Sequence, residues 1–202
     1  MKGDISMPPK QKFSREEIIV ASLNITRREG ITGITARGLG AELNSSARPI
    51  FTVFKNMEEV HLETIKAAKA IYNEYIQKGL VEIPAFKGVG IAYIHFSKDE
   101  PKLFQLLFMT ENNGISLELS DILPAIDENS NRILESVQKY GMSKEKSYKL
   151  YQYLWLFTHG IATLYATGVC RFTEKQVSEM LTEVFTSILT KMKQESEVKS
   201  DD

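Results

Sequence analysis

The 202 residues of the chain are enough to bury a substantial core, and a formal net charge of −1 gives no sign of a protein that coats nucleic acid or a membrane. The single cysteine, Cys170, excludes an intramolecular disulfide, and no apolar run approaches the ~20 residues needed to span a bilayer. These features predict a cytoplasmic protein without a membrane segment.

The charge is unevenly distributed along the chain. Up to Asn56 there are nine Lys and Arg against five Asp and Glu, a net charge of +4, which leaves −5 for the remainder. Residues 1–13 lack the apolar stretch of a signal peptide and are expected to form a flexible basic arm. A basic front and an acidic body are typical of a protein that docks one end on phosphate groups.

Helix signals dominate the sequence, and the alternation typical of strands is absent. Ser14 and Glu17 form a capping box, which predicts a helix that runs to about Glu29 and ends at Gly30. The apolar positions on one face of this helix are Ile18, Ala21 and Ile25.

Residues 35–54 are predicted to form two short helices joined by a tight turn. Thr35 opens the first helix, Asn44 accepts the left-handed conformation of the turn, and Ser45 or Ser46 caps the second helix. The apolar positions are Leu39, Leu43, Ile50 and Phe54. This arrangement is the one by which a protein presents the tip of a helix to the DNA major groove.

Further helices are expected in the rest of the chain, over residues 57–78, 84–98, 101–109, 120–140, 143–166 and 174–193, with a disordered tail at 194–202. The first of these should end at Gly79. Its inward positions should be Val60, Ile65, Ala68, Ile71 and Tyr75.

The last two expected helices carry more apolar surface than one core can cover. We therefore expect a homodimer in which this helical pair packs against its symmetry mate. The interface residues should be Leu164, Leu181, Phe185 and Ile188.

Residues 14–60 resemble the DNA-binding domain of the TetR family of bacterial regulators, with gapless spacing from Thr35 to Val60. The residues that carry the resemblance are Ile18, Ala21, Gly30, Thr35, Arg37, Leu39, Ser45, Ile50, Phe51, Phe54, Glu58, Glu59 and Val60. Residues 154–168 are also similar to a Trp/Phe-His-Gly segment in the effector domain of one branch of the family. The resemblance implies an all-α fold, with a helix-turn-helix domain at 14–60 and a larger ligand-binding and dimerisation domain at 61–193.

Four positions depart from the usual family pattern, which has Ala, Gly, Tyr and Lys where this chain has Gly40, Asn44, Phe51 and Met57. The last two changes remove a hydroxyl and a charge that usually contact phosphate, and Arg48 and Lys55 are the candidate replacements. The expected DNA contacts are Thr35, Arg37, Ser45, Ser46, Ala47, Arg48, Pro49, Phe51, Thr52 and Lys55, with Lys10 and Lys12 from the arm.

These contacts fall into two groups. Ser45, Ser46 and Arg48 offer hydrogen bonds to base edges, and Ala47 and Pro49 offer apolar contacts to thymine methyl groups. The residues expected at phosphates are Thr35, Arg37, Ser46 and Lys55, with Lys10 and Lys12 from the arm. The alternative is that these charges are merely solvated on an ordinary helical bundle.

The middle of the chain is rich in aromatic residues, and the resemblance implies a pocket for a small apolar or aromatic effector. The expected pocket residues are Tyr93, Phe96, Phe104, Phe108, Trp155 and His159; the alternative is that they are simply core. His61, His95 and His159 are too far apart in sequence to suggest a metal site, and no cofactor is expected. No catalytic motif is present, which predicts that the chain is not an enzyme.

The sequence therefore predicts a homodimeric repressor that binds a double-stranded inverted-repeat operator and is released by a small-molecule effector. The alternative is a helical small-molecule-binding protein whose front unit no longer reads DNA.

Overall fold

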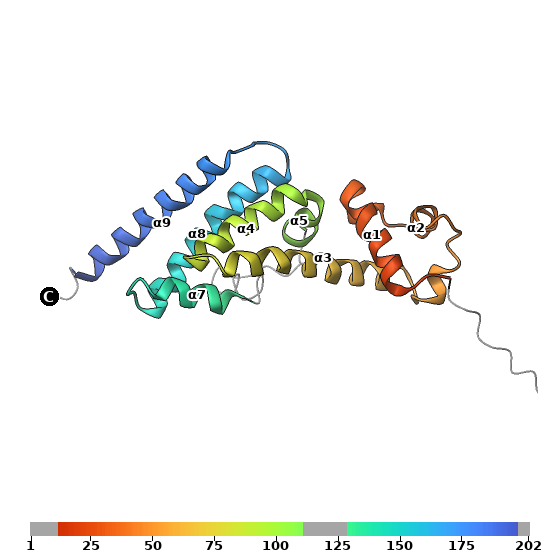
Figure 1. Cartoon of the computed structure of the whole chain (residues 1–202), viewed down its shortest axis with the longest axis horizontal. Coiled ribbons are helices and arrows are strands. Elements are labelled where there is room, and N and C mark those ends of the chain that lie inside the picture. Colours follow the sequence, from red (N-terminus) through yellow and green to blue (C-terminus); the bar gives the residue numbers. More distant parts are fainter. Residues whose placement is uncertain (1–11, 111–128, 198–202) are drawn as a thin grey trace, which may run out of the picture. The chain divides into compact units, whose positions relative to one another are not determined.

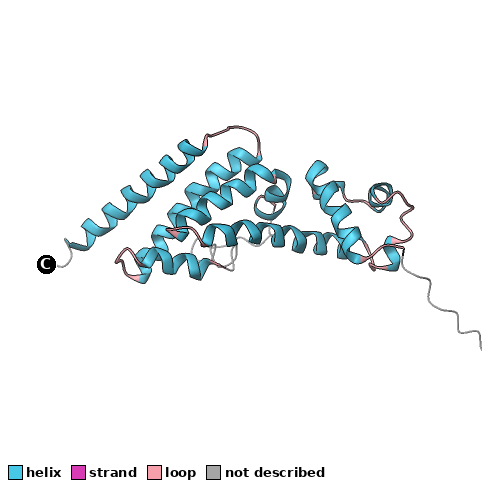
Figure 2. Ribbon diagram, in the orientation of Figure 1, coloured by secondary structure: helices cyan, strands magenta, loops and turns pink. Residues whose placement is uncertain are grey.

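The computed structural model describes residues 12–110 and 129–197, and every regular element within these ranges is a helix (Figure 2). This confirms the predicted all-helical fold. The chain divides into two compact units between Lys69 and Ala70, and each is described by itself. That division and the domain boundary expected after residue 60 both fall within helix α3, Met57–Leu80. None of the described helices is long and apolar enough to cross a bilayer.

The first unit begins with α1, Arg15–Glu29, and α2, Ala36–Glu42, which are followed by a 3₁₀ helix η2, Ile50–Thr52, and the start of α3 (Figure 1). The predicted capping box of α1 is present. The Ser14 hydroxyl accepts a hydrogen bond from the Glu17 amide at 3.1 Å, and the Glu17 carboxylate accepts one from the Ser14 amide at 2.7 Å. Gly30 ends α1 with a φ of 80°.

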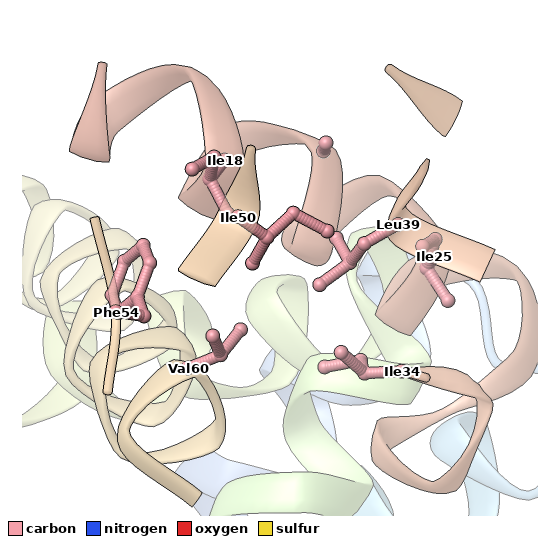
Figure 3. Close-up of a cluster of buried hydrophobic side chains, with 8 residues drawn as sticks. Ile18, Ile25, Ile34, Leu39, Ile50, Phe54 and Val60 are labelled. Carbon is pink, nitrogen blue, oxygen red and sulfur yellow. The ribbon is translucent and has the colours of Figure 1, made fainter. Parts of the chain in front are cut away.

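One apolar cluster holds the first unit together, and Figure 3 shows its side chains converging from α1, α2, η2 and α3. Its buried members are Ile18, Ala21, Ile25, Ile34, Leu39, Ile50, Phe54 and Val60. The predicted inner face of α1 is therefore confirmed. Full burial of one large apolar side chain contributes about 1.5–3 kcal/mol, so this small unit depends on each member.

The second short helix differs from the prediction. In place of an α-helix capped by Ser45 or Ser46, the chain makes turns up to Pro49 and then the single 3₁₀ turn η2. No side chain in the described part of the chain caps the start of η2. Its hydrogen bonds span three residues, as in the bond from the Thr52 amide to the Pro49 carbonyl at 3.2 Å. Pro49 has no amide hydrogen and so cannot contribute a bond that would extend the helix backwards.

Helix α3 runs two residues past its predicted end. Gly79 lies inside the helix and does not end it. A Cβ at this position would lie 2.6 Å from the carbonyl oxygen of Gly88, so glycine is needed here for close packing between helices. Val60 and Ala68 are buried as predicted, whereas Ile65, Ile71 and Tyr75 are only half-buried. The buried side chains are those of Val60, Thr64, Ala68, Tyr72 and Ile76. Residues spaced by four are offset by about 40° per step around an α-helix, so the buried side of α3 winds around the helix axis. The prediction assumed one straight face.

The second unit contains α4, Ala85–Asp99; α5, Pro101–Phe108; α7, Ser130–Gln138; α8, Lys144–Ala166; and α9, Glu174–Glu197. Helices α4 and α8 lie side by side, α5 and α7 contact both, and α9 packs on both (Figure 1). The predicted caps of α8 and α9 are present: the Lys146 amide donates to the Ser143 hydroxyl at 3.3 Å, and the Gln176 amide donates to the Thr173 hydroxyl at 3.2 Å.

Two predicted segments need correction or lie partly outside the described residues. Of the helix expected at 120–140, the structure describes α7; residues 111–128 lie outside its description. Residues 194–197, assigned from the sequence to a disordered tail, continue α9 as helix. Of the expected basic arm, only Lys12 and Phe13 are described.

Candidate nucleic-acid interface and ligand cavity

The turn between α2 and η2 is built from local backbone requirements. The Thr35 hydroxyl accepts a hydrogen bond from the Gly38 amide at 3.0 Å and so caps α2, as predicted. Asn44 has a φ of 49°, the left-handed conformation predicted for this turn. The Ser45 amide donates to the Gly40 carbonyl at 2.7 Å, and a Cβ on Gly40 would lie 3.0 Å from the Ser45 carbonyl oxygen. Glycine at position 40 thus lets the turn pack closely on α2.

Most of the predicted DNA-contacting residues lie on the surface of this turn and its flanks. Those with exposed side chains are Thr35, Arg37, Ser46, Arg48, Phe51, Thr52 and Lys55, and those that are half-buried are Ser45, Ala47 and Pro49. The Nζ of Lys12 lies 2.8 Å from the Oγ of Ser45, which brings the end of the basic arm to the same turn. Lys10 lies outside the described residues.

The cations of this unit differ in whether they have acidic partners. Within the described residues, the side chains of Arg37, Arg48 and Lys55 make no ion pair or hydrogen bond. Because none of the three side chains is held in an ion pair there, all three are available to phosphate or base edges.

Two other arginines are engaged inside the unit. Arg15 pairs with Glu59 at 2.8 Å and lies over the Phe54 ring at 4.3 Å. Arg28 forms two hydrogen bonds to the carboxylate of Glu42, at 2.7 and 3.2 Å. The Lys55 amide and then Arg15 lower the pKa of Glu59, and Arg28 lowers the pKa of Glu42. These arginines fasten α1 to its neighbours.

The second unit contains a cavity of about 250 Å³ between α4, α8 and α9. Phe86, Tyr140 and Phe185 line it, with ring centroids 4.4–5.7 Å apart. A smaller cavity of about 40 Å³ shares part of this lining and reaches Tyr93 and Trp155. A third depression of about 440 Å³ is lined by polar side chains, including Lys78, Glu82 and His95, and is more open to solvent.

The six predicted pocket residues are divided between core and cavity wall. Phe96 and Phe104 are fully buried, and Phe108 packs on both of them with ring centroids 6.5 and 5.2 Å away. Only Tyr93 and Trp155 line a described cavity. The larger cavity takes its three rings from segments far apart in sequence, so no local pattern in the chain singles it out.

Each of the three histidines has a different neighbour. The His159 ring shares a hydrogen bond of 2.9 Å with the Tyr93 hydroxyl and stacks on Trp155 at 4.9 Å, and burial lowers its pKa. His61 lies 3.1 Å from the Ile34 carbonyl, and His95 lies 2.9 Å from the Glu174 carboxylate.

The predicted dimer residues differ in their burial within the chain itself. Leu181 and Phe185 are 7% and 8% exposed and pack in their own unit, while Leu164 and Ile188 are half-buried. The outer face of α8 instead exposes Tyr153 and Leu156, at 38% and 44%, and it continues through Gly160 to Leu164 at helical spacing.

Comparison with known families identifies the second unit. Residues 86–191, more than half of the chain, match the family model of the tetracyclin repressor-like C-terminal domain. No curated protein matches the chain significantly. Regulators of this family are generally not enzymes. With the helix-turn-helix resemblance of the first unit, this match shows that the chain belongs to the TetR family and is a TetR-type transcriptional regulator.

Proposed function

We propose that the chain is a homodimeric repressor that binds an inverted-repeat DNA operator through the α2–η2 turn and is released by a small apolar or aromatic effector. The observation that carries the proposal is the set of unpaired cations, Arg37, Arg48 and Lys55, around this turn. Counterions released from phosphate by such side chains supply much of the affinity of proteins for DNA.

Backbone contacts and base contacts are assigned to different residues of the turn. The Thr35 hydroxyl already accepts from Gly38, so its own hydrogen remains to donate to a phosphate. Arg37 and Lys55 are the proposed phosphate contacts on either side. Arg48 is the proposed base contact, because a guanidinium can bond the O6 and N7 atoms of guanine together.

The remaining predicted residues complete the proposed surface. Ser46 is exposed and can donate to a phosphate or a base edge, and the half-buried Ala47 and Pro49 offer apolar contacts to thymine methyl groups. Phe51 is exposed at 45% on η2, which is unusual for an aromatic side chain unless it has a partner. We assign Phe51 and Thr52 to contacts with the DNA backbone.

The proposed dimer uses the outer faces of α8 and α9. Tyr153, Leu156 and Gly160 form one exposed apolar stripe, and two such stripes facing each other across a two-fold axis would bury them. An effector in the second unit would release the operator by favouring a different separation of the two reading turns. It has this effect only if it binds one of the two states more tightly.

One observation favours the alternative of a small-molecule-binding protein that does not read DNA. The element η2 is a single 3₁₀ turn of three residues, shorter than a complete recognition helix. Phe51 and Met57 also lack the hydroxyl and the charge that the family usually has at these positions.

Selection of bound sequences from a random DNA pool, followed by mobility-shift titration at low and physiological salt, tests the proposal. We expect an inverted repeat to be selected and its preference over unrelated DNA to persist at physiological salt. The triple variant Arg37→Ala, Arg48→Ala, Lys55→Ala should lose this binding, while Arg28→Ala should keep it. Failure to select any sequence would leave the alternative as the better description.

A further inference from the structure

We infer that the 250 Å³ cavity between α4, α8 and α9 binds a hydrophobic monocarboxylate, with its apolar body among the aromatic rings and its carboxylate on Lys87. This inference rests on the proposed function in one respect only, namely that the bound ligand is the effector that releases the operator. Binding itself requires no DNA.

The cavity has the size and wall of a site for one substituted ring or a short alkyl chain. An apolar cavity of ~150 Å³ is enough to hold benzene, so about 250 Å³ leaves room for a ring and a substituent. Its aromatic wall is continuous, because the Phe185 ring lies 4.4 Å from Phe86 and 4.9 Å from Tyr140. Leu154 and Leu181 complete the apolar lining.

Gly90, in the interior of α4, keeps this space open. A Cβ at Gly90 would find no atom nearer than 3.8 Å, so helix packing does not demand glycine here. At Gly79, by contrast, a Cβ would lie 2.6 Å from a backbone oxygen. Glycine in the interior of a helix makes that helix less stable than alanine would. Gly90 lines both the larger and the smaller cavity. The missing side chain therefore provides volume for a ligand.

Lys87 gives the cavity its preference for a negative charge. It is the one charged residue in the lining, and in the described part of the chain no carboxylate pairs with it. Its Nζ lies 3.1 Å from the Thr182 hydroxyl oxygen, which holds the ammonium at the cavity wall.

The threonine hydroxyls of the lining offer little competing recognition. Those of Thr158, Thr182 and Thr186 donate to carbonyl oxygens of their own helices, at 2.7–2.9 Å. Because a single cation faces an otherwise apolar cavity, a ligand with one negative charge is matched. A second charge would be left without a partner in an apolar site.

Trp155 reports on occupancy. It is the only tryptophan of the chain and lines the smaller cavity, which shares Phe86, Gly90 and Leu154 with the larger one. Its indole N–H is buried and has no hydrogen-bond partner among residues 12–110 and 129–197. A ligand that enters from the larger cavity changes the surroundings of this ring and hence its fluorescence.

The test uses the full chain with two carboxylates, 4-butylbenzoate and octanoate, and their uncharged primary alcohols as matched probes. Trp155 fluorescence and thermal shift measure binding. We expect each carboxylate to bind at least about tenfold more tightly than its alcohol. Lys87→Met, which keeps the aliphatic stem, should abolish this preference, and Lys175→Met, on the exposed surface of α9, should keep it. Gly90→Leu should abolish binding of all four probes without lowering the melting temperature.

Equal affinity for carboxylate and alcohol, absence of binding by every probe, or an unchanged preference in Lys87→Met would overturn the inference. Operator binding by the unliganded protein is measured separately. Its loss without loss of probe binding would contradict the proposed function and not this site. Intact operator recognition without probe binding would contradict the ligand site and not the proposed function.

Discussion

The arginines of the first unit look alike in sequence but have different surroundings. Arg15 and Arg28 have carboxylate partners within hydrogen-bond distance, whereas the Arg37 and Arg48 side chains have none in the described part of the unit. Exposed ion pairs of this kind are screened by water and add little to stability, so we expect the paired arginines to act mainly by holding α1 against its neighbours. The unpaired Arg37 and Arg48 have no such role within the unit, and we propose that they contact DNA.

Replacing Arg48 with alanine should separate base reading from backbone holding. We expect a loss of about 1–3 kcal/mol on the selected operator and relaxed preference at one position per half-site, because a bidentate contact to guanine would be lost. Lys55→Ala should weaken binding to all DNA alike and reduce the salt slope by about one per lost phosphate contact. Mobility-shift titrations at several salt concentrations measure both effects.

Arg28→Ala is the matched control, because its guanidinium is held by Glu42 and should leave DNA affinity nearly unchanged. If Arg48→Ala instead behaved like Lys55→Ala, Arg48 would be a phosphate contact. Base reading would then fall to Ser45, Ser46, Ala47 and Pro49, and specificity would depend more on DNA shape.

His159 should make the stability of the second unit depend on pH. Burial lowers its pKa below the ordinary value near 6.5, so the unfolded chain takes up the proton more readily than the folded one. Stability is therefore fully present above about pH 6.5 and is lost as the pH falls through the folded-state pKa. We expect the melting temperature to fall between about pH 7 and pH 5, and the fall should be smaller in His159→Gln.

Trp155 fluorescence provides an independent reading of the same proton, because the two rings are stacked. Its titration midpoint should lie below 6.5, the ordinary value for histidine. A midpoint above that value would show that the Tyr93 hydrogen bond stabilises the protonated ring more than burial destabilises it.

At the scale of the helices, two glycines mark where α3 and α4 approach closely. A methyl group on Gly88 would clash with the Gly79 carbonyl, and that carbonyl belongs to rigid helix backbone. Gly88→Ala should therefore destabilise the protein by about 1–3 kcal/mol, as overpacking does elsewhere. Chemical denaturation measures the change in the free energy of unfolding.

Gly90→Ala tests the same helix two residues further on. Its new methyl group has ordinary contacts at 3.8 Å, so the helix should gain up to about 1 kcal/mol from the better helix former. Equal effects of the two substitutions would mean that α3 and α4 are not packed as closely as the structure shows.

Helix starts were predictable from sequence because caps are local. Ser14, Ser143 and Thr173 each bond an amide three residues ahead, which a short window of sequence contains in full. Helix ends and types were less predictable where distant residues decide them. Gly79 has the sequence signature of a helix stop, and only its contact with Gly88, nine residues later, shows that it lies inside the helix.

The distance in sequence between the residues of a site also decides whether that site can be predicted. The proposed DNA contacts outside the basic arm lie within 21 consecutive positions from Thr35 to Lys55, so their grouping was visible in the sequence. The proposed ligand cavity joins Phe86, Tyr140 and Phe185 from three separate segments. The sequence instead indicated Phe96 and Phe104, which are fully buried. Helical periodicity identifies an apolar face but does not say whether the protein or a ligand covers it.

At the scale of the whole molecule, the proposed dimer depends on the outer face of α8. Leu156→Glu should dissociate the dimer and change the stability of the folded protomer by no more than about 0.5 kcal/mol, because this side chain is 44% exposed. Phe185→Glu should unfold the protein, since removal of a buried phenylalanine alone costs about 3–5 kcal/mol. Analytical ultracentrifugation and circular dichroism distinguish the two outcomes.

The monomeric Leu156→Glu variant also tests how the operator is read. Two reading turns on one dimer bind two half-sites with a high effective concentration, so the full inverted repeat should be bound far more tightly than one half-site. In the variant this advantage should disappear while half-site affinity stays the same, because Leu156 lies in the second unit and contacts no DNA in the proposed arrangement. Titration of full and half operators measures the ratio. A variant that remains dimeric and keeps the full advantage would place the interface on another face, with α9 residues such as Ile188 as the next candidates.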